Sequence, residues 1–316
     1  MDGLNELLNR AATITDSGRD GFFDMPSQYF SPGFWTAYVA RAKSRNLNLE
    51  QLAIPPKTLE YAKAIAIERA LGLADTYPYS RSGAGGQYSP LVLLESREQT
   101  DNATSEINSC IRGLFGEPEY AEFVSTMCEL VGDLLDNVWA HGKATGFSMA
   151  QKWKNYPDFN FEFAIADYGM GFLRELQRVG IPGIHDHESA IRWCIQRGNS
   201  TKKRAVAEWE QRLPPDMMGN PIGRDARVVE TDNHHMGLGL AKLIDAVEQF
   251  HGCCWLASGD TLLFISPDGN RTYSRLPMEW EGVAIACRFD SSRITGIRAQ
   301  YTQDEFETIL SELFRS

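Results

Sequence analysis

The chain has 316 residues, 43% of them hydrophobic and 23% charged, a composition typical of a globular protein with one large domain or two smaller ones. Its formal net charge of −11 argues against a general nucleic-acid binder, because such proteins neutralise phosphates with Lys and Arg. No apolar run approaches the roughly eighteen residues of a membrane helix, and the start MDGLNELLNR has no signal-peptide core. We therefore expect a cytoplasmic protein with no membrane partner and no direct nucleic-acid partner.

The N-terminal part, residues 1–95, is expected to form a small α/β adaptor domain. A strand-like run at 21–26 precedes a helix at 31–46 that a Pro-Gly pair opens, and a second helix begins with a Pro-Pro pair. The stretch 74–90 is rich in Gly, Ser, Pro and Tyr, which predicts a linker or exposed loop. A domain boundary is expected near this loop.

The second half of the chain alternates between helical and strand-like patterns. A helical region is expected over 105–141, a strand over 159–167 and a helix over about 188–197. Residues 201–233 are charged and without clear periodicity, and they are long for a connection, so we expect a functional or mobile segment. A well-patterned helix follows within 234–252.

The C-terminal part predicts strands and then a helix. The strand-like runs are 253–258, 261–266 and 282–290. Gly259 and Asp260 separate the first two runs, which is a hairpin signal. The tail, 291–316, has a capping box of Thr302 with Glu305 before an apolar helical face, so a C-terminal helix is expected there.

Three polar side chains recur along the helix expected over 105–141. Asp133, Asn137 and His141 stand at i, i+4 and i+8 beside an apolar stripe, so they share one strip of the helix. The Asn137 oxygen could hold Mg²⁺ and Asp133 could orient a water molecule, because hard cations prefer oxygen ligands and keep several waters. A solvated helix face explains the same spacing.

Glycines follow the strand expected over 159–167. The strand ends at Asp167, and Gly169 and Gly171 come next. A carboxylate there could accept a hydrogen bond from an exocyclic amine such as that of adenine, and glycines let backbone pass close to the ring. A plain Asp-Gly turn is the alternative.

Two further glycines, Gly237 and Gly239, precede the helix within 234–252. Glycine weakens a helix start relative to Ala by up to about 1 kcal/mol. Two glycines there therefore indicate that the backbone comes close to a ligand or to another part of the chain. One candidate is phosphate, which binds at the free N–H groups and positive dipole end of a helix. The other candidate is a tight turn.

Together and in this order, the three motifs resemble the Bergerat-type ATP-binding fold of the GHKL superfamily, which includes gyrase, Hsp90, histidine kinases and anti-sigma-factor serine kinases. The resemblance covers residues 105–290 and implies a two-layer α/β sandwich, preceded by the smaller N-terminal α/β domain. It implies that Asn137 binds Mg²⁺ and bridges it to the phosphates, that Asp167 binds the adenine amine, and that 198–236 form a mobile lid. The other nucleotide-binding positions that it implies are His141, Gly169, Gly171, Gly237, Leu238, Gly239 and Leu240.

Two positions depart from the family pattern. Asp133 stands where hydrolytic members carry a catalytic Glu, and it is one methylene shorter, so slow or absent ATP hydrolysis is compatible with it. Gly282 and Val283 stand where many members have Gly-Thr, which removes a hydroxyl that could meet the phosphates.

The sequence also narrows the choice within the superfamily. No histidine precedes the expected nucleotide domain, and few residues follow it, which disfavours a histidine kinase and a topoisomerase. The run NVWAHG looks most like the anti-sigma serine kinases, and the N-terminal segment faintly resembles STAS-type domains, which partner them. We therefore expect an ATP-dependent switch on a protein partner, with or without slow ATPase or Ser/Thr kinase activity. The sequence does not distinguish a monomer from a homodimer. The alternative is a catalytically degenerate binding module.

Overall fold

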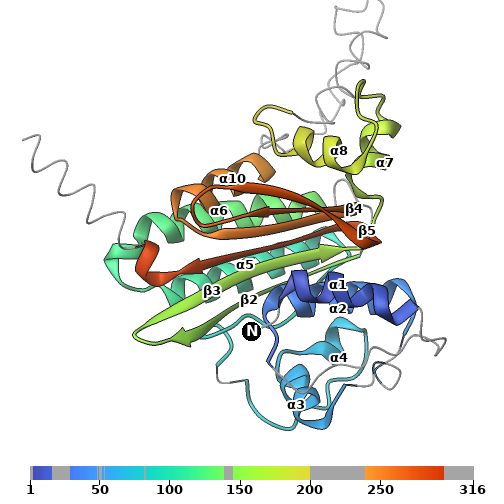
Figure 1. Cartoon of the computed structure of the whole chain (residues 1–316). Helices are drawn as coiled ribbons and strands as arrows, with labels where there is room; N and C mark the ends of the chain where they lie inside the picture. Colours follow the sequence, from blue (N-terminus) through green and yellow to red (C-terminus); the bar gives the residue numbers. More distant parts are fainter. Residues whose placement is uncertain are drawn as a thin grey trace, which may run out of the picture.

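A computed structural model of the chain describes residues 3–15, 29–47, 49, 52, 54–81, 83–138, 145–199 and 239–294, without the side chains of residues 11–15 and 137. A five-stranded antiparallel sheet crosses the molecule in the order β1-β2-β3-β5-β4 (Figure 1). The strands are β1 (Val92–Leu94), β2 (Gly146–Asn155), β3 (Asp158–Asp167), β4 (Cys253–Ile265) and β5 (Arg271–Asp290). Together with the helices, this sheet confirms the predicted α/β class.

Helices cover both faces of the sheet (Figure 1). One face carries α5 (Arg97–Leu114), α6 (Ala121–Asn137) and α10 (Gly239–Gln249), and the other carries α1 (Leu4–Thr15) and α2 (Pro32–Ser44). The remaining helices lie beyond these layers and are α3 (Pro56–Ala64), α4 (Ile67–Ala70), α7 (Gly171–Arg178), α8 (His187–Cys194) and the short 3₁₀ helix η2 (Pro118–Tyr120). The described chain therefore has three layers.

Both faces of β3, in the middle of the sheet, are buried. Phe161 and Phe163 face α5, α6 and α10, whereas Ala164 faces the side of α1 and α2. Because side chains on both faces of β3 are buried, nearly all of its residues are apolar, and this apolar run is what predicts the strand. The small residues on the second face let α2 lie close to the sheet, since a Cβ added to Gly33 would lie 2.7 Å from the Cβ of Ala286.

The described N-terminal residues pack on the sheet. The described residues among 3–91 form helices and isolated β-bridges. The strand predicted at 21–26 lies outside the described residues. Phe34 and Trp35 on α2 are fully buried in a cluster that includes side chains of β2, β3, β4 and β5. The described residues of the segment predicted as an adaptor domain, 1–95, thus supply a helical layer and β1 to the same sheet.

The hairpin predicted at Gly259 and Asp260 is wrong, because β4 runs straight through both residues. Gly259 has a φ of +61°, and the register of β4 against β5 shifts on both sides of it, as in a β-bulge. The chain reverses later, where the N–H of Ser266 donates to the carbonyl of Asn270 at 2.9 Å. A positive-φ glycine serves a bulge and a turn equally well, so the dipeptide alone does not distinguish them.

Several other bounds differ from the predicted ones. The sequence pattern did not predict α1, β1, β2 or α7, and η2 divides the helical region expected over 105–141 into α5 and α6. α5 also begins earlier, because Ser96 caps it and accepts a hydrogen bond from the N–H of Gln99 at 3.3 Å. The strand predicted over 159–167 and the helix predicted over about 188–197 are confirmed as β3 and α8. Residues 295–316, most of the predicted tail helix, lie outside the described residues.

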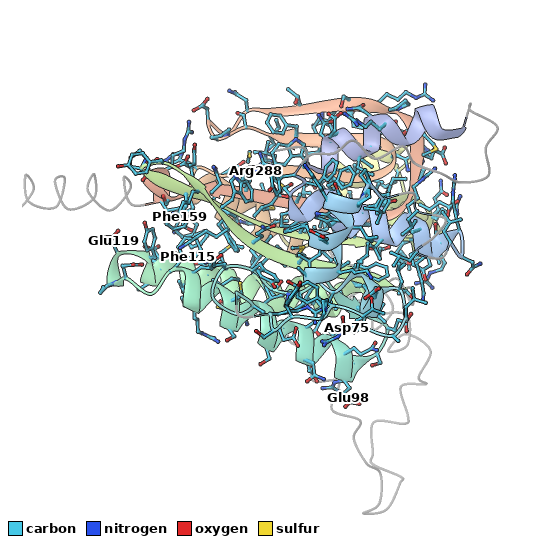
Figure 2. The ribbon with its side chains drawn as sticks, turned by 90° about the horizontal axis from the view of Figure 1, so that it is seen from below. Asp75, Glu98, Phe115, Glu119, Phe159 and Arg288 are labelled. Carbon is cyan, nitrogen blue, oxygen red and sulfur yellow. The ribbon has the colours of Figure 1, made fainter. Side chains whose placement is uncertain are left out.

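An aromatic cluster closes the core where β3 begins. The ring of Phe115, just after α5, lies 5.3 Å from the ring of Phe159 (Figure 2). It also lies 5.1 Å from the ring of Tyr120. This cluster anchors the α5–α6 connection at the opposite end of β3 from Asp167.

Candidate functional site

Asp167 is the last residue of β3, and it is only 8% exposed. Its Oδ1 accepts a hydrogen bond from the N–H of Gly169 at 2.8 Å, and its carboxylate accepts another from the N–H of Val283 on β5. Burial raises the pKa of the Asp167 carboxyl to about 6, and the two N–H donors act against this rise. The end of the central strand therefore holds a carboxylate that ionises near physiological pH.

Gly282 lets β5 pass directly beside this carboxylate. Its φ is +92°, and a Cβ there would lie 2.4 Å from Oδ1 of Asp167 and 2.7 Å from the backbone nitrogen of Gly169. The turn after Asp167 reaches Gly171, with a φ of +71°, where a Cβ would lie 3.0 Å from Oγ of Ser258. Any larger residue at 282 would collide with the turn, so glycine is required for this close approach.

Ser258 on β4 fastens the same turn to the sheet. Its hydroxyl donates to the carbonyl of Gly282 at 3.0 Å and accepts a hydrogen bond from the N–H of Phe172 at 3.1 Å. Sequence reasoning missed this residue, because its partners lie 24 and 86 positions away along the chain.

The C-terminal end of α6 lies beside this turn. The helix ends at Asn137, and the next residue, Val138, packs on Gly146, where an added Cβ would lie 2.6 Å from Cγ1 of Val138. Since Gly146 pairs with Asp167 across β2 and β3, the end of α6 and the end of β3 are neighbours. The side chain of Asn137 and the whole of His141 lie outside the described residues, so their roles stay predictions.

α10 begins at Gly239, which is buried, and Leu240 packs against the core formed with α5 and α6. Gly237 and Leu238 lie outside the described residues. Only the second half of the predicted glycine motif, Gly239 and Leu240, therefore lies in the described residues, in the first described turn of α10.

Lys242 joins the first turns of α10 to α6 by ion pairs. Its Nζ donates to Oε1 of Glu129 at 2.6 Å and to Oδ2 of Asp133 at 2.9 Å. The hydrogen bond to Glu129, and then the contacts with Asp133, raise the pKa of Lys242. Two carboxylates at i and i+4 on α6 are a sequence signal for a nearby cation. The sequence does not show which residue supplies that cation, because Lys242 lies 109 residues after Asp133.

The segment between the two glycine motifs begins with α7 and α8. Asp186 caps α8 and accepts a hydrogen bond from the N–H of Ser189 at 2.7 Å, while the ring of His187 packs directly on Gly259 of the β4 bulge. Apart from its first two residues, the predicted lid, 198–236, lies outside the described residues.

The described part of the chain has neither a cluster of metal-binding side chains nor a membrane-spanning helix. Within it, no group of three or more His, Cys, Asp or Glu side chains could hold a metal ion, so Mg²⁺ binding through Asn137 stays a prediction. Across the same ranges, no helix is long and apolar enough to cross a membrane.

Comparison of the chain with protein-family models, with curated proteins and with solved structures found no match. The fold and the site define an α/β protein with a buried carboxylate, enclosed by glycine backbone, at the end of its central strand.

Proposed function

We propose that the chain binds ATP as its Mg²⁺ complex where α6, the end of β3 and the start of α10 meet, and that it acts as a cytoplasmic regulatory switch on a protein partner. The observation that carries this proposal is the carboxylate of Asp167, buried at a strand end beside Gly282 and Gly169. The GHKL proteins that the motif order resembles bind adenine with a carboxylate in the corresponding place.

The chemistry of Asp167 supports recognition of an exocyclic amine. Each carboxylate oxygen can accept about two hydrogen bonds, so acceptor capacity remains after the N–H groups of Gly169 and Val283 have donated. The carboxylate is mostly ionised at pH 7, since its pKa is about 6. Adenine presents an amine where guanine presents a carbonyl oxygen, and two facing acceptors repel, so this site favours adenine.

The start of α10 supports phosphate binding nearby. A helix N-terminus offers free N–H groups and a partial positive charge, and Gly239 places no side chain over them. Asn137, at the end of α6, is the residue that would bind Mg²⁺ and bridge it to the phosphates.

Turnover is a separate question from binding. An ATPase or Ser/Thr kinase would need a proton acceptor, and Asp133 is the candidate, whereas a degenerate module would bind without turnover. The ion pair between Asp133 and Lys242 favours slow turnover over fast, because the ammonium ion occupies an oxygen of the acceptor. Turnover of labelled ATP with and without a protein partner separates these possibilities.

Asp167→Ala tests nucleotide binding. We expect it to lower the affinity for ATP and ADP by about ten- to a hundredfold, since losing a hydrogen bond to a charged group costs about 1.5–3 kcal/mol. Calorimetry in the presence of Mg²⁺ measures the affinity, and circular dichroism checks the fold. Undiminished affinity in a folded Asp167→Ala protein overturns the proposal.

A pair of glycine variants provides the matched control. Gly282→Ala should also weaken ATP binding, because its Cβ would displace Asp167. Gly269→Ala should leave binding unchanged, since Gly269 has a similar φ of +78° with nothing within 4 Å of an added Cβ. Equal losses in both variants would assign the effect to backbone strain and remove the support from Gly282.

A further inference from the structure

Lys242, near the start of α10, forms an ion pair with Asp133 on α6, the candidate proton acceptor. Its ammonium group lies 2.6 Å from Glu129 and 2.9 Å from Asp133. The two carboxylates differ in burial, because the side chain of Asp133 is 7% exposed and that of Glu129 is 61% exposed. Water screens the pair with Glu129, whereas Lys242 compensates a largely desolvated charge at Asp133.

The ion pair changes what Asp133 can do. Oδ2 of Asp133 already accepts a hydrogen bond from Nζ of Lys242, so this oxygen is occupied. The pKa of Lys242 itself is raised, so the ammonium ion stays charged at physiological pH.

We propose that Lys242 is a positioning residue that restrains ATP hydrolysis by holding the carboxylate of Asp133. The inference rests on the proposed function and deepens it. In the reaction, a water oxygen forms a bond to the γ-phosphorus of ATP, and the bond from that phosphorus to the bridging oxygen breaks. The bridging electron pair leaves with ADP, and the proton of the water passes to Asp133 and then to solvent. Lys242 slows the proton transfer.

The position of Lys242 couples this restraint to the nucleotide. Lys242 lies three residues after Gly239, at the end of α10 where phosphate is proposed to bind. A ligand that moves the start of α10 therefore also moves the ammonium ion relative to α6. The same ion pairs hold α10 against α6.

Lys242→Met tests the inference in the full-length protein. We expect kcat for release of labelled phosphate from Mg-ATP to rise about tenfold or more, with KM within about threefold, because general-base catalysis contributes about 10²–10⁴-fold. Lys242→Arg should keep the wild-type rate, since it restores the cation. Adding Asp133→Asn to Lys242→Met should abolish the gain.

Arg271→Met is the matched control, because Arg271 pairs with Glu248 near the other end of α10 and its loss should leave kcat unchanged. Lys242→Gln, which keeps a polar side chain without the charge, serves if the Met variant does not fold. A kcat that does not rise in a folded, ATP-binding Lys242 variant overturns this inference and leaves the proposed function standing. Absence of ATP binding in the wild-type protein overturns both.

Discussion

Asp167 is ionised at neutral pH in an environment that penalises its charge. Its pKa is about 6 in the folded protein, compared with an ordinary value of 3.8, because burial outweighs the two backbone donors. The folded protein therefore binds this proton more tightly than the unfolded chain does. The penalty is full above about pH 6, and it disappears as the pH falls towards 4, so the raised pKa gives relative stability in acid that is lost as the pH rises.

Asp167→Asn should remove this penalty. We expect the free energy of unfolding at pH 7.5 to rise by about 1–3 kcal/mol, since a shift of about two pKa units corresponds to about 3 kcal/mol at most and an amide pairs less well with two N–H donors. Urea unfolding at pH 7.5 and pH 4 measures the effect. Most of the difference between the variant and the wild type should vanish at pH 4, and an equal difference at both pH values would contradict this account.

Single residues were predictable from the sequence when their signal was local. Asp167 followed from an apolar run that ends in Asp-x-Gly-x-Gly, all within one strand and its turn. Lys242 and Glu162 did not follow, because each acts through partners more than a hundred residues away. The local sequence around a charged residue in a strand or helix does not indicate which distant group that residue contacts.

At the scale of elements, Glu162 joins α2 to the sheet. This β3 residue is 1% exposed, and its Oε1 accepts hydrogen bonds from the hydroxyl of Ser31 at 2.6 Å and the N–H of Gly33 at 2.8 Å. Its Oε2 accepts from Nε of Arg288 at 2.8 Å, and the Arg288 guanidinium (Figure 2) lies 5.1 Å from the ring centre of Trp153. A negative charge at the N-terminus of α2 also suits the helix dipole.

Glu162→Ala should therefore be strongly destabilising. We expect a loss of about 3–5 kcal/mol in the free energy of unfolding, because the change leaves Arg288 and the start of α2 without their buried partner. Urea unfolding measures it. Glu188→Ala breaks an exposed Glu-Arg pair on α8 and should cost less than about 1 kcal/mol. Similar small losses in both variants would show that Glu162 does not fasten α2.

Two features that the sequence patterns missed or misread, β2 and the bulge at Gly259, share a physical cause. β2 is buried on both faces along its first half, so it lacks the alternation that identifies a half-buried strand. The Gly-Asp pair at the bulge is also a hairpin signal, but β4 continues to pair with β5 on both sides of Gly259, whose backbone the ring of His187 contacts. Tertiary packing, absent from any local window, set both outcomes.

At the scale of the whole molecule, two buried clusters share one sheet. One buried cluster joins the sheet to α5, α6 and α10, and a second joins its other face to α1 and α2. β3 contributes to both clusters and carries both Glu162 and Asp167. The described residues among 29–70 thus share a buried cluster with all four long strands of the sheet.

We therefore expect residues 29–70 and 239–290 to unfold in one cooperative transition, although a chain of 316 residues often unfolds in steps. Hydrogen exchange across a urea series, read by mass spectrometry, gives a midpoint for each segment. Mg-ATP at a hundred times its Kd should add about 2.7 kcal/mol to the free energy of unfolding of both segments, because a ligand that binds only the folded state stabilises everything that unfolds with its site. The opposite result would be a urea midpoint for 29–70 that lies below the midpoint for 239–290 and does not respond to ATP. It would mean that the N-terminal helices and the nucleotide site unfold independently, and that β3 does not couple the two faces of the sheet.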